Sequence, residues 1–419
     1  MISMEHLIKN PDLYSDELKK RFKDVTLVER IVNLHIELKP LQAQLELLRA
    51  KKNQFNNIVI TLSGAQKQEK ISEMREVSNN IQSLEEQTKI INSQIEDLLY
   101  QVPNLTWSGI PVGPNSDSNI ETAVHGAKPV YDFQPKNYYE LPVFIRDYDN
   151  KRGVEASGFR GYYIQGQLAL LQKALFDWSL GRLIEKGFNY IIPPVFVQDE
   201  VMYGTGFFPA GVEDAYEIKV GDRSFWLPGT SEAALMFYHS NQVLDLSIPV
   251  KLAAHTRCFR KEAGAYGKDT KGGIRVTQFE KIETVFICRP EDSYKVFDEM
   301  TSIFRETLDL LGLYYHDLET SSGDNSNKNH RMIDIEAWFP AQETFRELAS
   351  SSNCTDYQTR TLNIKTNLDN GEKVFAHSLN CTGITNRTMF AIMEQFQQSD
   401  GRVKIPEVLV KAFGKEYLE

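Results

Sequence analysis

The first quarter of the chain contains a long stretch in which helix-breaking residues are almost absent. Between residues 25 and 100 the only proline is Pro40 and the only glycine is Gly64. Mostly apolar residues recur there at spacings of three, four or seven, in one series before Gly64 and another after it: Leu34, Leu38, Leu41, Leu45, Leu48 and Phe55, then Met74, Ile81, Thr88, Ile91, Ile95 and Leu98. Such spacings place side chains on one face of a helix, so the stretch predicts two long helices.

Ser63 and Gly64 lie between the two apolar series, where the chain can reverse direction. Each helix would have about 35 residues and a length of about 50 Å, at 1.5 Å per residue. The simplest arrangement is an antiparallel coiled-coil hairpin over about residues 25–100. Such a hairpin is either a dimerisation element or an arm that reaches a partner, and the pattern alone favours dimerisation.

Composition narrows the class of protein. The chain has 419 residues, which suggests two or three domains, and its formal net charge is -10 from 47 basic and 57 acidic residues. These values exclude a collagen-like or wholly disordered chain and argue against a generally basic nucleic-acid-coating protein. A local basic surface for nucleic acid remains open, because steering depends on the local field.

The cysteines and the start of the chain predict a cytoplasmic protein. The four cysteines are scattered, with no CxxC pair, as is typical of reduced thiols. No run reaches the roughly 20 apolar residues that a membrane helix needs, so no membrane association is expected. The N-terminal sequence lacks the apolar core of a secretory signal.

A change in composition near residue 100 divides the chain. Proline and glycine punctuate the sequence after Gln101, so we expect a first domain over 1–104, a linker over 105–137 and a second domain over 138–419. We expect helices at 167–186, 231–242, 290–311 and 387–397, and strands at 224–227, 254–260, 275–287, 332–339 and 374–379. Strands outnumber the units of an alternating βαβ fold, which favours α+β with a mainly antiparallel sheet.

The segment from Thr256 to Phe286 has the strongest candidates for binding residues, and its pattern predicts a strand, a loop and a second strand. Arg260 and Glu262 are two residues apart, as are Phe279, Lys281 and Glu283, so each set is expected to share a face. Arginine, carboxylate and an aromatic ring together suit a nucleoside triphosphate and an amine-bearing substrate. A solvent-facing hairpin with surface salt bridges explains the same charges and is the commoner outcome.

This segment resembles a known family. FRKEAG followed by IRVTQFEKIE is similar to motif 2 of the class II aminoacyl-tRNA synthetases, and of the seryl-tRNA synthetases in particular. GFNYIIPPVFV resembles motif 1, GTSEAAL the TxE loop, RELASSSNCTDYQTR the ExxS segment, and LNCTGITNRTMFAIMEQFQ motif 3. The five matches occur in the family's order, and the hairpin matches its tRNA-binding arm.

The resemblance implies a fold and an activity. It implies an N-terminal coiled-coil arm followed by a class II catalytic domain with a mainly antiparallel sheet flanked by helices. It implies a homodimer that activates L-serine with ATP and Mg²⁺ to seryl-adenylate and pyrophosphate. The serine would then pass to the 3′ end of tRNA(Ser), and of tRNA(Sec) where one is present.

The resemblance also assigns roles to residues. The catalytic residues would be Arg260 and Arg387, and Mg²⁺ would be held by Glu347 and Ser350. ATP binding falls on Arg260, Lys261, Glu262, Arg275, Phe279, Glu347, Leu348, Ala349, Ser350 and Arg387. Serine binding falls on Thr230, Ser231, Glu232, Arg260, Glu283 and Thr382.

The chain departs from the family pattern in several places. Ser231 replaces an alanine, Lys261 a serine and Asn386 a glycine, and the run from Asn380 to Arg387 is one residue shorter. The shorter run leaves the register of Thr382 open. Two rival interpretations remain, a paralogue that delivers the amino acid to another carrier and a non-catalytic tRNA-binding protein.

Asp334 and Glu336 alternate along the predicted strand and could be additional site carboxylates, although without the family resemblance they would be read as surface residues. The eight histidines show no metal-ligand spacing and are read as structural.

Overall fold

The structure is a computed structural model that describes residues 1–59, 63–263, 267, 269 and 271–419. The chain divides into two compact units, Ile2–Pro103 and Asn104–Glu419, and Met1 belongs to the second. The sequence-based divisions at 1–104, 105–137 and 138–419 stay a prediction. Lys268, in the basic loop expected between the two motif 2 strands, and residues 60–62 of the expected hairpin turn lie outside the described residues.

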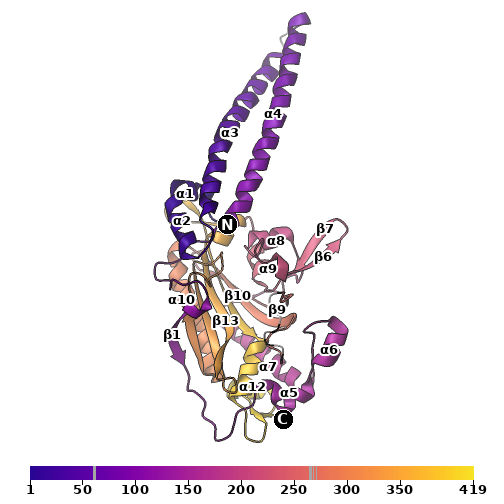
Figure 1. Cartoon of the computed structure of the whole chain (residues 1–419), viewed down its shortest axis with the longest axis vertical. Coiled ribbons are helices and arrows are strands. Elements are labelled where there is room, and N and C mark those ends of the chain that lie inside the picture. The colour runs from indigo at the N-terminus through magenta and orange to yellow at the C-terminus, as the bar shows by residue number, and fades with distance from the viewer. Residues whose placement is uncertain (60–62, 264–266, 268, 270) are drawn as a thin grey trace. The chain divides into compact units, whose positions relative to one another are not determined.

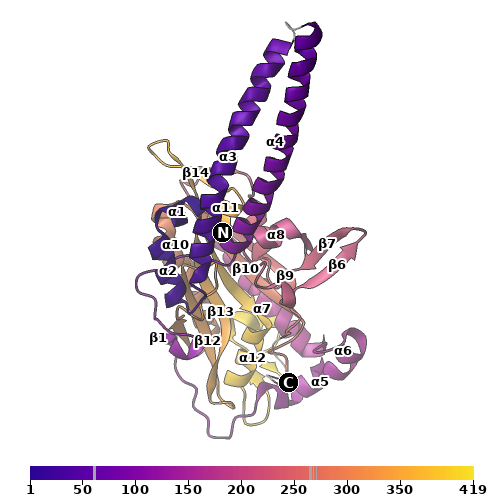
Figure 2. The same ribbon diagram turned by 45° about the horizontal axis from the view of Figure 1, so that its top comes forward.

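The N-terminal unit is built on the predicted helical hairpin. Helices α3 (Thr26–Ile58) and α4 (Gly64–Leu99) pack side by side (Figures 1 and 2). The predicted seam is confirmed, because its residues are buried or half-buried, and Val77 joins it. Ion pairs of 2.6 Å between Arg49 and Glu85 and 2.7 Å between Lys51 and Glu73 link the two helices.

Two short helices precede the hairpin and were not predicted from the sequence. They are α1 (Met4–Lys9) and α2 (Pro11–Lys20), and α2 packs against α3. The Ser3 side chain caps the first helix and Pro11 begins the second, a position where a missing N–H costs nothing. Leu7 and Leu18 are fully buried within the described part of the chain.

The second unit is centred on an eight-stranded sheet. Its neighbours pair antiparallel except at one edge, where the last two strands are parallel, so the predicted α+β class with a mainly antiparallel sheet is confirmed. In spatial order the strands are β1 (Ile120–His125), β11 (Tyr315–Glu319), β12 (Arg331–Phe339), β13 (Thr344–Thr355), β16 (His377–Thr385), β10 (Gln278–Cys288), β9 (Val250–Phe259) and β4 (Asn189–Tyr190).

The two faces of this sheet pack against different hydrophobic cores, as the alternating side chains of strand β10 show. Ile282, Phe286 and Cys288 point to the main hydrophobic core, which contains α7 (Gly166–Glu185), α10 (Ser293–Leu311) and α12 (Asn386–Gln395). Val285 and Ile287 point the other way, to a smaller core. Phe279, Lys281 and Glu283 are in phase with this second pair, so they share its face.

The smaller elements surround the sheet. The remaining helices are α5 (Pro142–Asp147), α6 (Asn150–Ser157), α8 (Asp199–Gly204), α9 (Glu232–Phe237), α11 (Tyr357–Thr361) and α13 (Glu407–Phe413). The minor strands are β2 (Tyr148–Asp149), β3 (Tyr163–Ile164), β5 (Val197–Gln198), β6 (Tyr216–Val220), β7 (Arg223–Leu227), β8 (Val243–Leu244), β14 (Lys365–Asn367), β15 (Lys373–Phe375), β17 (Val403–Lys404) and β18 (Tyr417–Leu418).

Several predicted boundaries were wrong. Strand β9 ends at Phe259, and Glu262 has a left-handed backbone with φ of +55°, so Arg260 and Glu262 do not share a strand face. Arg275 likewise precedes β10, which begins at Gln278. The helix expected over 231–242 is only the six residues of α9, and the strand expected over 374–379 is divided between β15 and β16.

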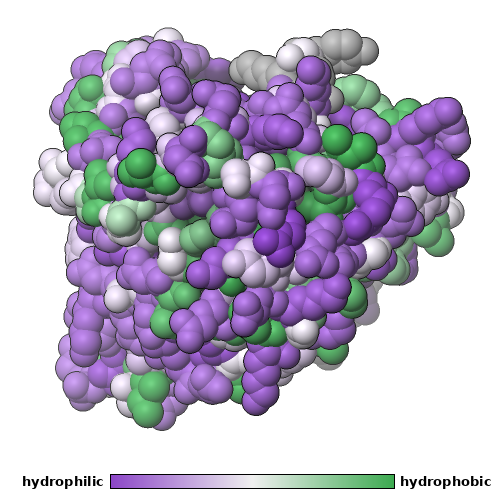
Figure 3. Space-filling view, turned by 90° about the horizontal axis from the view of Figure 1, so that it is seen from below, coloured by the Kyte–Doolittle hydropathy of each residue, from purple (hydrophilic) through white to green (hydrophobic). Residues whose placement is uncertain are grey.

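The face of the molecule drawn in Figure 3 is mostly hydrophilic, with hydrophobic residues in small scattered groups. Such scattered groups are normal for a protein surface in water. Within the described ranges, no helix combines the length and the apolar character needed to cross a membrane.

Candidate active site

A cavity of about 570 Å³ opens on the sheet face that carries Phe279. It is lined by the predicted residues Arg260, Glu262, Phe279, Glu347, Leu348, Ala349, Thr382 and Arg387. Gly273, Ile274, Val276, Lys281, Thr385 and Asn386 also line it and were not predicted to. Residues up to 127 positions apart in the sequence therefore meet at one site.

Arg260 and Phe279 form one side of this cavity. Phe279 pairs with Cys258 across strands β10 and β9, and Arg260 follows directly after β9. The guanidinium carbon of Arg260 lies 5.3 Å from the centre of the Phe279 ring. A planar cation beside an aromatic ring offers surfaces for stacking a planar base and positive charge for a phosphate.

Arg387 and Glu347 form a second side. Arg387 is in the first turn of α12, whose N-terminus is capped by the Thr385 hydroxyl. Its Nη1 donates to the Glu347 carboxylate at 3.1 Å and to the Glu347 carbonyl at 2.9 Å. Desolvation opposes ionisation of Glu347, but Arg387 and Arg260 outweigh it and lower the pKa of this carboxyl. The carboxylate is thus charged and available to a cation.

Asp334, one of the two possible additional carboxylates, forms an oxygen-rich corner with Ser350 and Glu347. The Ser350 hydroxyl lies 2.6 Å from the Asp334 carboxylate and 3.2 Å from that of Glu347. Burial and the neighbouring Glu347 charge raise the pKa of Asp334 well above its ordinary value. Of the two readings of Asp334, the surface one is wrong, because its side chain is half-buried and bonded to Ser350. Its alternation with buried Ile333 and Ile335 was the signal that placed it on this face.

Glu283 lies on the same strand face as Phe279, deeper in the unit. Its Oε2 accepts from the Thr230 hydroxyl at 2.6 Å and pairs with the Lys281 ammonium. Glu283 is 1% exposed and Lys281 6% exposed, so the ion pair is buried. The strand pairing sets Thr382 directly opposite Glu283, next to a bulge, which fixes the register that the sequence left open.

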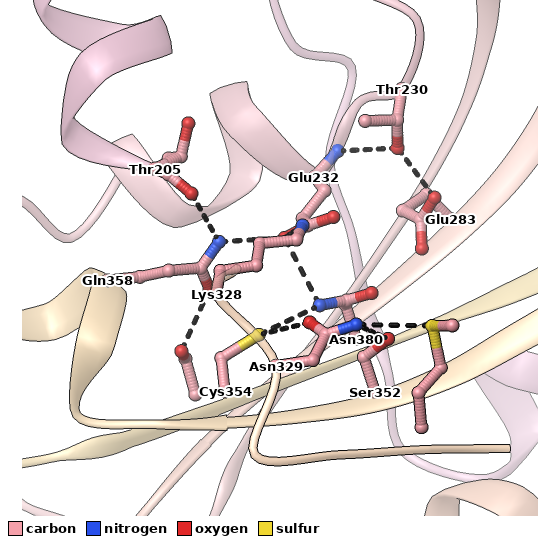
Figure 4. A network of polar contacts seen from close by, with 12 residues as sticks. Thr205, Thr230, Glu232, Glu283, Lys328, Asn329, Ser352, Cys354, Gln358 and Asn380 are labelled. Carbon is pink, nitrogen blue, oxygen red and sulfur yellow. Dashed lines mark hydrogen bonds and ion pairs between the residues drawn. The ribbon is translucent and has the colours of Figure 1, made fainter. Parts of the chain in front are cut away.

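Glu232 begins helix α9 and is held by several donors. Figure 4 shows it with Thr230 and Glu283 on one side and Lys328 and Gln358 on the other. Its backbone N–H donates to the Thr230 hydroxyl at 3.2 Å, while its carboxylate Oε1 accepts from Gln358 at 2.7 Å. Lys328 also contacts this oxygen. No sequence signal marked Lys328, which stands in a polar run without periodicity.

Seven predicted site residues are not part of the cavity lining: Thr230, Glu232, Glu283 and Ser350, described above, and Lys261, Ser231 and Arg275. Lys261 is exposed, and its ammonium lies 5.8 Å from the centre of the Tyr216 ring. Ser231 is buried, and its hydroxyl has no hydrogen-bond partner among the described residues. Arg275 donates to Glu262 at 3.2 Å and to Asp269 at 3.1 Å, so its link to the cavity is indirect.

The unusual Asn386 has a structural explanation. Its side-chain oxygen accepts from the Glu280 backbone N–H at 2.8 Å, and its side-chain nitrogen donates to Gln172 at 2.8 Å. Asn386 therefore ties the start of α12 to β10 and α7, and a glycine there could form neither contact. The short run before Arg387 is held in place by these bonds.

Family comparisons agree with the two units. The model described as the tRNA synthetase class II core domain (G, H, P, S and T) matches residues 216–396. The model described as the seryl-tRNA synthetase N-terminal domain matches residues 1–106.

Whole-chain comparisons extend the match. The serine–tRNA ligase of Clavibacter michiganensis is 35% identical over 98% of this chain and 96% of that protein. The serine–tRNA ligase of Thermobifida fusca is 34% identical over 100% of this chain and 99% of that protein. The crystal structure of seryl-tRNA synthetase from Pyrococcus horikoshii complexed with ATP has a TM-score of 0.90 at 32% identity, covering 100% and 99% of the two chains. That of the Naegleria fowleri cytoplasmic serine–tRNA ligase with AMP has a TM-score of 0.84 at 30% identity, covering 98% and 96%.

Proposed function

We propose, starting from the fact that this chain belongs to the seryl-tRNA synthetase family, that its cavity on the β10 face is where serine is activated. The chain is a serine–tRNA ligase, which forms seryl-adenylate from serine and ATP and then charges tRNA(Ser). The observation that supports the location best is the continuous strand face of β10. Phe279 lines the cavity, and Glu283, four residues along, accepts from Thr230.

The ATP subsite would use the residues that line the cavity. The adenine would lie against Phe279, and Glu262 would accept from its amino group. Arg260 and Arg387 would contact the phosphates, at the N-terminus of α12 where anions are favoured. Leu348 and Ala349 would supply the apolar floor. We extend the assignment to Arg275 through its bond to Glu262 and to Lys261 as a flexible outer contact.

The serine subsite would lie on the side of Glu283, Thr230 and Thr382. Carboxylate and hydroxyl oxygens can accept from the serine ammonium and bond its hydroxyl, and Arg260 would take its carboxylate. A subsite whose polar groups pair with a hydroxyl rejects alanine, because the same groups would stay buried and unpaired. Ser231 and Glu232 belong to the same loop and would complete it.

The reaction needs little acid–base chemistry from the protein. The serine carboxylate oxygen attacks the α-phosphorus of ATP, the bond to the β-phosphate oxygen breaks, and pyrophosphate leaves. Negative charge grows on the phosphoryl oxygens, and the Arg260 guanidinium is placed to stabilise it. Binding both substrates in one cavity supplies the remaining acceleration through orientation.

The oxygen donors near Ser350 fit a magnesium ion. Glu347, Ser350 and Asp334 present oxygen atoms, which this hard cation prefers. In the part of the chain that the structure describes, no group of three or more histidine, cysteine or acidic side chains could hold a metal ion by itself. Bound Mg²⁺ would neutralise phosphate charge, and ATP phosphates would supply further ligands.

The assignment of the hairpin and of the assembly also belongs to the proposal. Helices α3 and α4 would contact tRNA(Ser), and tRNA(Sec) where one is present, through their long exposed faces.

In the segment that resembles motif 1, Ile192 is 80% exposed and Phe196 is 51% exposed. Exposed apolar side chains of this kind suit a homodimer interface. We place the protein in the cytoplasm, where its four free buried cysteines would stay reduced.

Amino-acid-dependent ATP–pyrophosphate exchange tests this proposal. Serine should support exchange, whereas alanine and threonine should support little. Exchange that is equal for serine and alanine would contradict the serine subsite, and exchange that is unaffected in Phe279→Ala would contradict the adenine assignment.

A further inference from the structure

Lys328 is a buried lysine in direct contact with the proposed serine subsite. It lies in the loop before β12 and is only 7% exposed. Its ammonium contacts Glu232 Oε1 and lies 4.2 Å from the centre of the Phe207 ring. A charge this deeply buried is costly unless it is paired, so the contact with Glu232 is required for Lys328 to be charged at all.

Three donors converge on the same oxygen of Glu232. Besides Lys328, Oε1 accepts from Gln358 Nε2 at 2.7 Å and from Asn380 Nδ2 at 3.1 Å. Gln358 is itself held, because its Nε2 donates to the Thr205 carbonyl at 2.9 Å and its Oε1 accepts from Ser378 at 2.8 Å (Figure 4). Among the described residues, every hydrogen bond and ion pair of this carboxylate is therefore made by Oε1.

The other carboxylate oxygen, Oε2, is left without a donor among the residues that the structure describes. Thr230 and Glu283 lie on the opposite side of Glu232 from Lys328 and Gln358 (Figure 4). The carboxylate thus has one oxygen with three donors and one oxygen that can still accept a hydrogen bond. The Thr230 hydroxyl accepts from the Glu232 backbone N–H and so holds the start of helix α9.

We propose that Lys328 is a positioning residue for the serine amino group, which keeps Glu232 ionised and immobile so that Oε2 can accept from the substrate ammonium. This inference rests on the proposed serine subsite. It assigns to this chain a lysine that none of the sequence motifs contains. In the opposite arrangement, Lys328 would compete with the substrate ammonium for Glu232. Removing Lys328 would then raise kcat/KM for serine.

The charge state of the pair supports this role. Burial favours the neutral amine, but the Glu232 carboxylate outweighs it, and the pKa of Lys328 is raised. Among the described residues, the ionisable groups that act on the pair are Glu283 with Lys281 on β10 and Cys354 on β13, and the N-terminal amine of Met1 lies near Cys354. Burial raises the pKa of Cys354 to about 12, so its thiol does not titrate near neutral pH.

Removing the ammonium would leave the Glu232 carboxylate buried without a counter-charge. Such a carboxyl binds its proton more tightly, and in the protonated form it is a poor acceptor for an ammonium. Lys328→Met should therefore lower kcat/KM for serine about 30-fold or more at pH 7, by analogy with truncated buried charge pairs. Because Glu232 would ionise again at higher pH, the loss should shrink as the pH rises.

The experiment is serine-dependent ATP–pyrophosphate exchange between about pH 6 and pH 9. The readout is the ratio of each variant's kcat/KM for serine to that of the unmodified chain, since this ratio cancels the titration of serine itself. Lys328→Arg retains the charge and should recover most of the activity. The matched control is Lys251→Met, which removes a lysine that pairs with Glu299 at 2.5 Å and lies 5.7 Å from the Phe286 ring, outside the site.

The expected result is a serine-specific, pH-dependent loss in Lys328→Met, a normal KM for ATP, and no such loss in Lys251→Met. An unchanged or improved KM for serine in Lys328→Met would overturn the inference alone. Absence of serine-dependent exchange in the unmodified chain would overturn both the inference and the proposed function.

If Lys328→Met does not fold, a double variant can be used to test the same role of Lys328. Glu232→Gln with Lys328→Met removes both charges, so no unpaired ion is buried. This variant should bind ATP normally and use serine poorly, with a ratio to the unmodified chain that does not change with pH. Normal serine use, or a ratio that still rises with pH, would refute the role assigned to Lys328.

Discussion

Glu283 should serve two separable purposes, stability and serine use, and a double-mutant cycle with Lys281 can separate them. The Glu283 carboxylate pairs with the Lys281 ammonium and accepts from the Thr230 hydroxyl at 2.6 Å. Both members of the ion pair are nearly inaccessible, at 1% and 6% exposure. Glu283→Ala therefore leaves a lysine ammonium and a hydroxyl buried without their acceptor.

The expected cost of Glu283→Ala is about 3–5 kcal/mol of unfolding free energy, the range for breaking a buried ion pair by removing one partner. Adding Lys281→Met removes the unpaired charge, so the double variant should be more stable than Glu283→Ala. The coupling energy between the two sites should exceed about 2 kcal/mol. Serine use should be lost in both, because neither retains the carboxylate.

Tryptophan fluorescence in a urea titration is the natural assay. The four tryptophans, at positions 107, 178, 226 and 338, all lie in the unit Asn104–Glu419, so the signal reports the unfolding of that unit alone. Serine-dependent exchange is measured on the same samples. Additive effects of the two substitutions within about 0.5 kcal/mol would refute the buried pair. Restored serine use in the double variant would refute the role of Glu283 in the subsite.

Three further results are expected. Arg260→Ala should slow serine activation by about 100-fold or more, the effect of losing one donor that stabilises developing charge, and serine-dependent ATP–pyrophosphate exchange measures it. Arg387→Ala should raise the KM for ATP far more than the KM for serine. Arg387 lines the proposed ATP cavity and bonds Glu347, whereas Thr230 belongs to the proposed serine subsite. Steady-state kinetics with each substrate varied measures both KM values. Burial raises the pKa of Glu394 to about 7, so the unfolded chain releases this proton first and stability falls as the pH rises through that range. Thermal unfolding of Glu394→Gln should lack that part of the decline between pH 4.5 and about pH 7.

The spacing of apolar residues along the sequence predicted the long helices but not the short ones. The spacing of Leu38, Leu45, Ile81 and Ile95 was sufficient for the hairpin, because a seam between two helices repeats along each chain. The short helices α1 and α2 were missed, since six and ten residues give too few repeats for a period to emerge. Helix α9 is shorter than the expected helix over 231–242, and Asn241, within that range, has a left-handed backbone with φ of +61°.

The site was predictable only where a short motif contained it. Phe279 and Glu283 could be placed on one strand face from their spacing, and Arg387 from its position at the start of a helix. Lys328 could not be predicted in the same way, because its partner Glu232 is 96 residues away and only the folded chain brings the two together. The alternation along the strand marked Asp334 as a possible site residue, but not its contact with Ser350, which is 16 residues away.

The central claim is that the unit Asn104–Glu419 activates serine and that the hairpin is needed to charge tRNA(Ser). The most direct measurement compares the intact chain with a chain in which residues 27–98 are replaced by a short flexible linker. Serine-dependent ATP–pyrophosphate exchange and serylation of a tRNA(Ser) transcript are measured for both. We predict that exchange stays near the intact rate and serylation collapses, because the arm would supply most contacts to the structured RNA. Normal serylation by the shortened chain would contradict the role of the hairpin, and absence of exchange in the intact chain would contradict the activity itself.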